Sequence, residues 1–340
     1  MRRWTTVLIV GAVVAVAVFA AADALRGRDE PKAPAGSPTI TRPKPPTLRD
    51  ILRREAIAGF VLYSDQNCRL HSLLLPRMVD DVVREEGGAE ALHCRFGIGG
   101  GRILEEGEVM SPDRSSIARC RDRTIAVWDA ERGIGRRSIR GCAPAWRPDG
   151  RLTYARGEAV YEDRLVLLNR SQLHLAARRH PNVAGLGAGI PFRVRVTDLA
   201  WLDEEHLVAS LEIRIRNVEF QYAAVLFDGG AIVDVDVRFG QPLRNWVVSD
   251  AGSYAASEDG TIVARDGGSI DPPQNLPTGT ADAFSPDEQW LAYATGVSIY
   301  LIGTPRNSEP GRIIRLPVQA QDLVWEPSGA GAMGTSTAAG

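Results

Sequence analysis

Short hydrophobic runs alternate with polar turns over most of the chain, and residues 281–303 show the arrangement best. There, Phe284 precedes the polar turn 285–288, and two apolar runs follow at residues 290–294 and 297–302. Apolar runs of this length, bounded by turn residues, are typical of β-strands. The segment therefore predicts strands that are joined by tight turns.

The same unit recurs five more times in a less regular form. Each copy is marked by a hydrophobic anchor residue before its turn, and the anchors are 36 to 55 residues apart. A period of about 40 residues with four short strands is that of propeller blades. We expect all six anchors to lie in blade cores: Met110, Trp146, Trp201, Val248, Phe284 and Trp325.

The two ends of the repeat region complete each other. No strand-like run follows Trp325, whereas residues 59–65 and 69–75 resemble the second and third strands of a blade that lacks its first strand. A strand over residues 321–326 that pairs beside them would close the ring and leave only short strand edges. We therefore predict an all-β fold, a six-bladed β-propeller over residues 58–328 with N- plus C-terminal strand closure.

A different kind of sequence precedes the repeats. Residues 4–22 carry no charge and follow Arg2 and Arg3. The run is long enough to span a bilayer, so residues 1–25 are predicted to be a transmembrane signal-anchor, with a cleaved signal peptide as the alternative. Arg2 and Arg3 orient the N-terminus towards the cytoplasm. The propeller is then expected on the extracytoplasmic side of the cell membrane, or secreted if the segment is cleaved.

Two further segments connect the anchor to the propeller. Residues 26–46 form a proline-rich linker, which favours the extended polyproline II conformation. Thr47 has the position of a helix N-cap, and Asp50 follows three residues later, so residues 47–57 predict a short amphipathic helix. At the other end, residues 329–340 are small and polar and are expected to be disordered.

Three of the turns support a resemblance. Residues 146–150 (Trp-Arg-Pro-Asp-Gly), 284–287 (Phe-Ser-Pro-Asp) and 110–113 (Met-Ser-Pro-Asp) resemble the W-S-P-D-G turn of TolB-like propeller repeats, which are related to WD-type repeats. The resemblance covers residues 58–328 and implies a β-propeller. It carries no catalytic residue, because this turn is structural: proline presets φ, aspartate binds nearby amides and glycine accepts a positive φ.

Four cysteines lie in the first two blades, and an exported chain can oxidise them. Three pairings are possible. Cys68 and Cys120 are both expected between the second and third strands of a blade, and Cys94 and Cys142 shortly before the next blade. This equivalence favours Cys68–Cys94 and Cys120–Cys142. A zinc site fits poorly, because no two cysteines have C-x-x-C spacing.

Blades 3 and 4 are predicted to be enlarged. In the third, Ser171 is expected to cap a short helix that runs to about Arg179 and ends before Pro181. The densest basic cluster of this insertion is a candidate binding site for an anionic partner, with a solvated helix end as the alternative: Arg170, Arg178, Arg179 and His180.

The remaining composition bears on function. The net charge of −2 at pH 7 argues against a nucleic-acid partner. No catalytic, metal-binding or cofactor motif is recognised, so we expect a non-enzymatic ligand- or protein-binding or scaffolding module of the cell envelope, whose partner is an envelope protein or polymer. The alternative is a propeller hydrolase or lyase that acts on a carbohydrate or lactone through carboxylates of the central channel.

Overall fold

The computed structural model describes residues 45–84, 107–186, 190–216, 219–229, 231–232 and 243–327. The chain divides into two units, Met1–Pro46 and Thr47–Gly340, and the second contains the folded domain. No helix in the described ranges is long and apolar enough to cross a membrane. The predicted anchor (1–25), nearly all of the linker (26–46) and the tail (329–340) lie outside these ranges and stay predictions.

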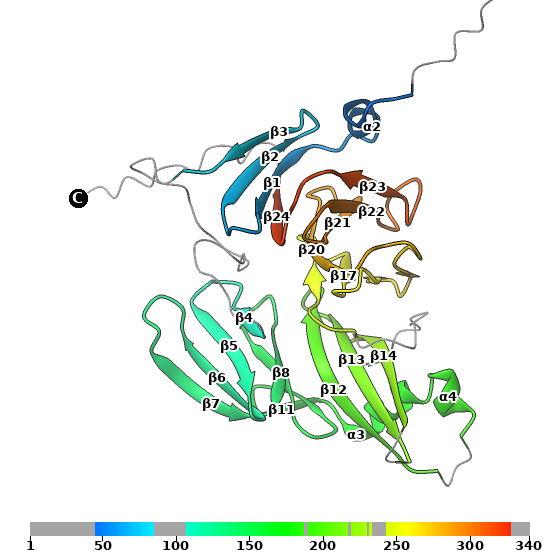
Figure 1. Cartoon of the computed structure of the whole chain (residues 1–340). Helices are drawn as coiled ribbons and strands as arrows, with labels where there is room; N and C mark the ends of the chain where they lie inside the picture. Colours follow the sequence, from blue (N-terminus) through cyan, green and yellow to red (C-terminus); the bar gives the residue numbers. More distant parts are fainter. Residues whose placement is uncertain are drawn as a thin grey trace, which may run out of the picture. The chain divides into compact units, whose positions relative to one another are not determined.

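Within the described residues, 24 strands form six antiparallel four-stranded sheets (Figure 1). We number them as blades 1 to 6. Their strands, in spatial order, are β24 (Asp322–Glu326), β1 (Gly59–Ser64), β2 (Leu70–Leu75) and β3 (Val79–Val82); β4 (Glu108–Met110), β5 (Ser116–Arg121), β6 (Thr124–Asp129) and β7 (Gly135–Arg140); β8 (Cys142–Trp146), β9 (Leu152–Ala155), β10 (Val160–Glu162) and β11 (Leu165–Leu168); β12 (Phe192–Trp201), β13 (His206–Ile215), β14 (Glu219–Asp228) and β15 (Ala231–Ile232); β16 (Val247–Val248), β17 (Tyr254–Ala256), β18 (Ile262–Ala264) and β19 (Ser269–Ile270); and β20 (Thr280–Phe284), β21 (Trp290–Ala294), β22 (Ile299–Gly303) and β23 (Ile313–Leu316).

The hydrophobic core lies between the blades rather than within any one of them. Five clusters of buried side chains join blades 2 and 3, 3 and 4, 4 and 5, 5 and 6, and 6 and 1. The first strands of consecutive blades pack together in the same order, from β4 beside β8 to β20 beside β24. Six consecutive meanders that pack in chain order are the organisation of a six-bladed β-propeller.

Blade 1 is built from both ends of the repeat region, which confirms the predicted closure. Strand β24 pairs antiparallel with β1, with Trp325 opposite Val61, and β2 follows as the third strand. Gly59 makes this approach possible, because its φ is +122° and an added Cβ would lie 2.6 Å from Glu326 O. Blade 1 therefore holds the N- and C-terminal strands in one hydrogen-bonded sheet.

The anchor residues mark equivalent positions in the six blades. Five of them end the first strand of their blade, and Trp325 is the penultimate residue of β24. Trp201, Phe284 and Trp325 are buried, at 4 to 7% exposure, and Met110, Trp146 and Val248 are half-buried. The period read from the sequence therefore locates the same structural position in each blade.

The turn after each anchor has the chemistry that its residues predict. The side chain of Ser111 donates to Asp113 Oδ1 at 2.6 Å, and Ser285 donates to Asp287 in the same way. In blade 3, Asp149 accepts from the backbone N–H of Arg151, and Gly150 has a φ of +86°. These local hydrogen bonds fix the reversal between the first and second strands.

A short helix covers the junction of blades 6 and 1. Helix α2 (Leu48–Arg54) begins after Thr47, which forms a capping box with Asp50 as the sequence predicted. Leu52 is fully buried in the cluster that joins these blades, and Glu55 forms an ion pair with Arg312 at 2.8 Å. The helix is therefore part of the domain.

Two helices connect blades 3 and 4, and their boundaries correct the prediction. Helix α3 (Arg170–Ala177) begins after Asn169, not at Ser171, because Asn169 and Gln172 form a capping box. Helix α4 (Pro181–Ala184) starts at Pro181, so this proline opens a second helix instead of only ending the first. Blade 4 is also enlarged, since β12, β13 and β14 each contain 10 residues.

Candidate functional site

The predicted basic cluster is taken up largely by contacts inside the domain. Arg170 forms an ion pair with Glu158 at 2.7 Å, and the Arg178 guanidinium lies over the ring of Phe192 at 5.2 Å. Arg179 is exposed at the end of α3. His180 is only 1% exposed, and its Nδ1 accepts from the backbone N–H of Asn182 to cap α4. Burial lowers the pKa of His180, which favours the neutral ring that this cap requires.

Helices α3 and α4 belong to the core of blades 3 and 4. Leu173, Ala177 and Val183 are fully buried in the cluster that these blades share. The outer side of α3 is exposed and includes Leu175, at 58%. A deletion of this connection would remove core side chains, so binding at these helices can be tested only through exposed residues.

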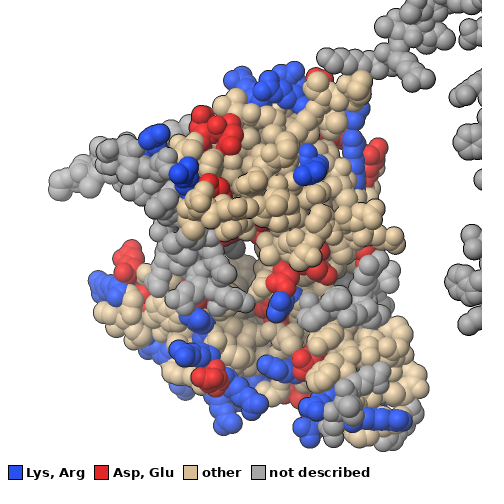
Figure 2. Space-filling view, in the orientation of Figure 1, with Lys and Arg blue, Asp and Glu red and all other residues tan. Residues whose placement is uncertain are grey.

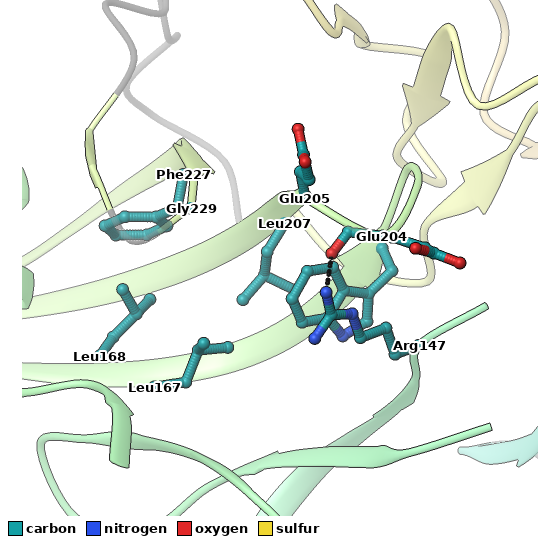
Figure 3. A pocket seen from close by; sticks show the side chains of 9 residues that line it. Arg147, Leu167, Leu168, Glu204, Glu205, Leu207, Phe227 and Gly229 are labelled. Carbon is teal, nitrogen blue, oxygen red and sulfur yellow. Dashed lines mark hydrogen bonds between the residues drawn. The ribbon is translucent and has the colours of Figure 1, made fainter. Parts of the chain in front are cut away.

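A cavity of about 140 Å³ lies where blades 3 and 4 meet. We call it the junction cavity (Figure 3). Its floor is apolar and comes from three strands: Leu167 and Leu168 of β11, Leu207 of β13 and Phe227 of β14. The other lining residues are Arg147, Trp201, Glu204, Glu205 and Gly229.

Arg147 fixes one wall of the cavity through contacts on several sides. Its guanidinium stacks on Trp201 at 4.9 Å and donates to Glu162 at 3.1 Å. It also donates to the backbone oxygen of Glu204 (Figure 3). Arg151 binds the same Glu162 carboxylate at 2.5 Å. Arg147 and Arg151 therefore share one carboxylate inside the domain.

A bulge in the outer strand of blade 3 directs two consecutive leucines into the cavity. The register between β10 and β11 shifts so that Val160 pairs with Leu168 and Tyr161 with Val166, which leaves Leu167 as an extra residue. A bulge re-aims side chains that would otherwise alternate between the two faces of a sheet. On the same strand, Leu165 and Val166 are 74% and 54% exposed.

Two desolvated carboxyl groups lie on first strands of the blades. Burial raises the pKa of Asp198 to about 6, against the opposing effect of backbone donors. Asp198 accepts from the N–H of Leu199 at 2.9 Å and from that of Asn245 at 2.6 Å, so it links blade 4 to blade 5. This arrangement gives Asp198 a structural role.

Asp282 on β20 is the second desolvated carboxyl. Its Oδ1 accepts from the hydroxyl of Thr280 at 2.9 Å, whereas its Oδ2 is buried without a hydrogen-bond partner. Burial, and then the neighbouring charge of Asp322 on β24, raise the pKa of Asp282 well above its ordinary value. The protonated form of Asp282 is therefore favoured between blades 6 and 1.

In the described ranges, no group of three or more histidine, cysteine, aspartate or glutamate side chains could hold a metal ion. Figure 2 shows acidic and basic side chains interspersed over the visible face.

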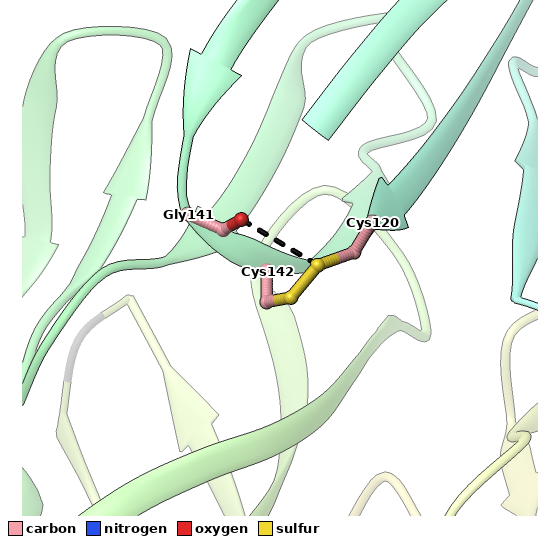
Figure 4. Close-up of a disulfide and its surroundings, with 3 residues drawn as sticks. All are labelled: Cys120, Gly141 and Cys142. Atoms are coloured by element: carbon pink, nitrogen blue, oxygen red, sulfur yellow. Dashed lines mark hydrogen bonds between the residues drawn. A yellow bond between two sulfur atoms is a disulfide. The ribbon is translucent and has the colours of Figure 1, made fainter. Parts of the chain in front are cut away.

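Cys120 and Cys142 form a disulfide, which is the pairing that repeat equivalence favours (Figure 4). The position of Cys120 differs from the prediction, because it lies inside the second strand β5, and Cys142 is the first residue of β8. The bond therefore ties blade 2 to blade 3. Cys68 is also in a disulfide. Cys94 lies outside the described residues, so the predicted Cys68–Cys94 pairing stays a prediction.

The junction cavity and the desolvated carboxyls are the features that the sequence did not reveal. The long apolar strands of blade 4 signalled an enlarged blade. Neither the burial of Asp282 nor the bulge at Leu167 has a signature in the order of residues.

No family model matches the sequence, and neither does any curated protein. Among solved structures, the chain is similar to the β-propeller domain of Myceliophteria thermophila Cps50 (Swd1), with a TM-score of 0.39, 14% identity, and coverage of 79% of this chain and 90% of that one. It is also similar to Kuenenia stuttgartiensis hydrazine synthase, with a TM-score of 0.31, 13% identity, and coverage of 68% and 94%. These scores are too low to carry an argument. The propeller assignment rests on the order, packing and closure of the six sheets.

Proposed function

We propose that this chain is a membrane-tethered, extracytoplasmic β-propeller that acts as a protein-binding or scaffolding module of the cell envelope. The observation that carries the proposal is the departure of blades 3 and 4 from the regular blade. Blade 4 has longer strands, two helices connect the two blades, and an apolar cavity lies at their junction. Binding residues commonly lie where a rigid scaffold departs from its repeat.

The proposed location rests on two further observations. The uncharged run at residues 4–22 after Arg2 and Arg3 has the length and flanks of a membrane anchor. The Cys120–Cys142 disulfide is consistent with an oxidising compartment. The Ser-Pro-Asp and Trp-Arg-Pro-Asp-Gly turns support a TolB-like kind of repeat within the propeller class.

A hydrolase or lyase is the second candidate, and Asp282 is the observation that favours it. A carboxyl whose pKa is raised by burial and by a neighbouring carboxylate is the kind of group that general acid and base catalysis uses. The buried position of Asp282 Oδ2 weighs against direct access by a substrate. Turnover of a carbohydrate or lactone that is lost in Asp282→Asn and retained in Asp198→Asn would favour this function over the first.

The two lysines of the chain allow a sharp test of location. Lys32 and Lys44 both lie in the proline-rich linker, directly after the predicted anchor. A membrane-impermeant amine reagent should label the protein in intact cells, or in spheroplasts where an outer membrane is present. The Lys32→Arg/Lys44→Arg variant serves as the control and should stay unlabelled. Labelling that requires lysis of the cells would contradict the proposal.

Binding is tested in the same cells. Because the folded domain contains no lysine, a diazirine cross-linker is preferable to an amine-reactive one. The full-length tagged protein should capture a reproducible envelope partner before lysis. A Leu165→Asp/Val166→Asp variant should lose this partner. An Ile134→Asp/Val297→Asp variant, which alters exposed apolar residues of blades 2 and 6, should keep it. Failure to enrich any partner over the untagged strain would count against a binding module.

A further inference from the structure

We infer that the junction cavity is the docking site for a segment of a partner protein that inserts one large apolar side chain and carries basic residues beside it. The inference rests on the proposed function as a protein-binding module and specifies the chemistry of the partner. It differs from the candidate cluster on α3, because no residue of that helix lines the cavity.

The size of the junction cavity sets the first requirement. An apolar cavity of about 150 Å³ holds one benzene molecule. The junction cavity, at about 140 Å³, therefore accommodates one aromatic or branched aliphatic side chain. Its floor of Leu167, Leu168, Leu207 and Phe227 offers such a side chain contacts that are apolar on three sides.

The apolar surface continues outside the cavity. Leu165 and Val166 precede the two lining leucines on β11 and are among the exposed large hydrophobic residues of the described ranges. Among the described strands, β11 is also the outer strand of its sheet and pairs with β10 alone. Adjacent exposed apolar residues that lead into a pocket are a feature of protein contact sites.

The charges around the cavity set the second requirement. Glu204 and Glu205 are exposed at its rim, and their carboxylates extend away from the apolar floor (Figure 3). Asp228, beside the lining residue Gly229, is exposed as well. Arg147 does not offset these charges, because Glu162 and Asp149 together pair with it and with Arg151. A basic segment is therefore attracted to the rim, whereas an acidic one is repelled.

The test uses three fluorescein-labelled peptides with the full-length protein, followed by fluorescence anisotropy. One has a phenylalanine flanked on each side by two arginines. The second replaces the phenylalanine by alanine, and the third replaces the arginines by glutamates. The first should bind at least about tenfold more tightly than either of the others, and its affinity should fall as salt is added.

Matched charge reversals locate the binding. Glu205→Lys should weaken the first peptide about tenfold. Glu131→Lys is the control, because both glutamates are exposed and both donate a backbone N–H to an aspartate two residues earlier, Asp203 or Asp129. Glu131→Lys should change the affinity less than about twofold. Thermal unfolding of both variants verifies that each is folded.

Several outcomes would overturn the site. If the alanine peptide binds as tightly as the phenylalanine peptide, charge alone is recognised. If the glutamate peptide binds as tightly as the arginine peptide, the acidic rim does not contribute to binding. Occupation of the cavity by a second copy of this chain would appear as concentration-dependent association that Glu205→Lys abolishes. If the partner captured in cells is unaffected by Glu205→Lys, the proposed function stands and the site fails. If the peptide binds as expected but no partner is captured in cells, the proposed function fails instead.

Discussion

The indole Nε1 of Trp201 donates a hydrogen bond of 2.9 Å to the hydroxyl oxygen of Thr153, across the boundary between blades 4 and 3. Thr153 is fully buried on β9, and Trp201 ends β12. Trp146 makes the equivalent connection to the backbone oxygen of Val109 in blade 2. These two anchors therefore hold consecutive blades together through a polar contact as well as through buried area.

Substitutions of Trp201 and Thr153 should separate the contribution of their hydrogen bond from that of the buried indole ring. Trp201→Ala should lower the free energy of unfolding by about 3–5 kcal/mol, because a buried ring is lost. Trp201→Phe keeps most of the ring and should cost about 1 kcal/mol, while Thr153→Val leaves the indole N–H without an acceptor and should cost about 1–3 kcal/mol. Urea unfolding of the Trp201→Phe/Thr153→Val double variant should give less than the sum of the two single costs. Full additivity would mean that the hydrogen bond contributes nothing.

Ring closure depends on the absence of a side chain at residue 59. Gly59→Ala places a Cβ 2.6 Å from Glu326 O and 2.7 Å from Trp325 Nε1, so β24 must move away from β1. We expect a loss of about 2–4 kcal/mol in the free energy of unfolding. Gly133→Ala is the control, because this glycine also has a positive φ, of +66°, but a Cβ added there meets no atom of the described residues within 4 Å. It should cost only about 1 kcal/mol, and equal effects of the two substitutions would argue against a tight closure at Gly59.

The Cys120–Cys142 disulfide should stabilise the junction of blades 2 and 3. It closes a loop with a sequence separation of 22, for which the chain-entropy account gives about 3 kcal/mol. The free energy of unfolding of the Cys120→Ser/Cys142→Ser variant should be lower by about 3 kcal/mol. The wild type should unfold at a lower urea concentration when it is reduced. Non-reducing peptide mapping provides the direct check, because a peptide that joins Cys68 to Cys120 would refute both predicted pairings.

Asp282 should give the domain an unusual pH dependence. Its pKa in the folded state lies well above that of an unfolded aspartate, about 4. The folded state therefore holds an additional proton above this pH, and the free energy of unfolding falls as the pH rises towards the folded-state pKa. Asp322 on β24 and Thr280 on β20 are the groups that face it. Asp282→Asn mimics the protonated form, so the free energy of unfolding in urea, measured at increasing pH above about 4, should decline less in this variant than in the wild type. An unchanged decline would mean that Asp282 is not the group responsible.

The architecture was largely readable from the sequence because blades repeat. Trp146, Phe284 and Trp325 precede turns of similar composition, and a repeated spacing fixes the position of each in its blade. Closure could also be inferred, since the final anchor lacked the strands that should follow it. These patterns are local, so they can be recognised from the sequence alone.

Helix ends in the blade 3 insertion were predicted less well. Ser171 is an acceptable cap, but Asn169 is the actual one because Gln172 stands three residues after it and completes the reciprocal hydrogen bonds. Pro181 stops one helix and also starts the next, since the first turn of a helix leaves its N–H groups unpaired in any case. At each boundary the sequence offers two local signals of similar strength, namely two possible N-caps at the start of α3 and two possible roles for Pro181.

The junction cavity could not be predicted because its walls come from distant parts of the chain. Leu167 and Phe227 meet only after two blades pack, and the bulge at Leu167 breaks the alternation that sequence reasoning assumes. The raised pKa of Asp282 could not be predicted for the same reason. It results from burial, and burial arises only when the blades pack together.

The claim that this propeller binds a partner at the junction of blades 3 and 4 is tested most directly by site-specific photo-crosslinking in intact cells. The photoreactive residue benzoylphenylalanine is placed at Leu165, beside the cavity, or at Val297, an exposed apolar residue of blade 6. We predict one discrete crosslinked product from position 165, which disappears when Glu205→Lys is added, and none from position 297. Products of the same mass from both positions, or no product from position 165, would contradict the account.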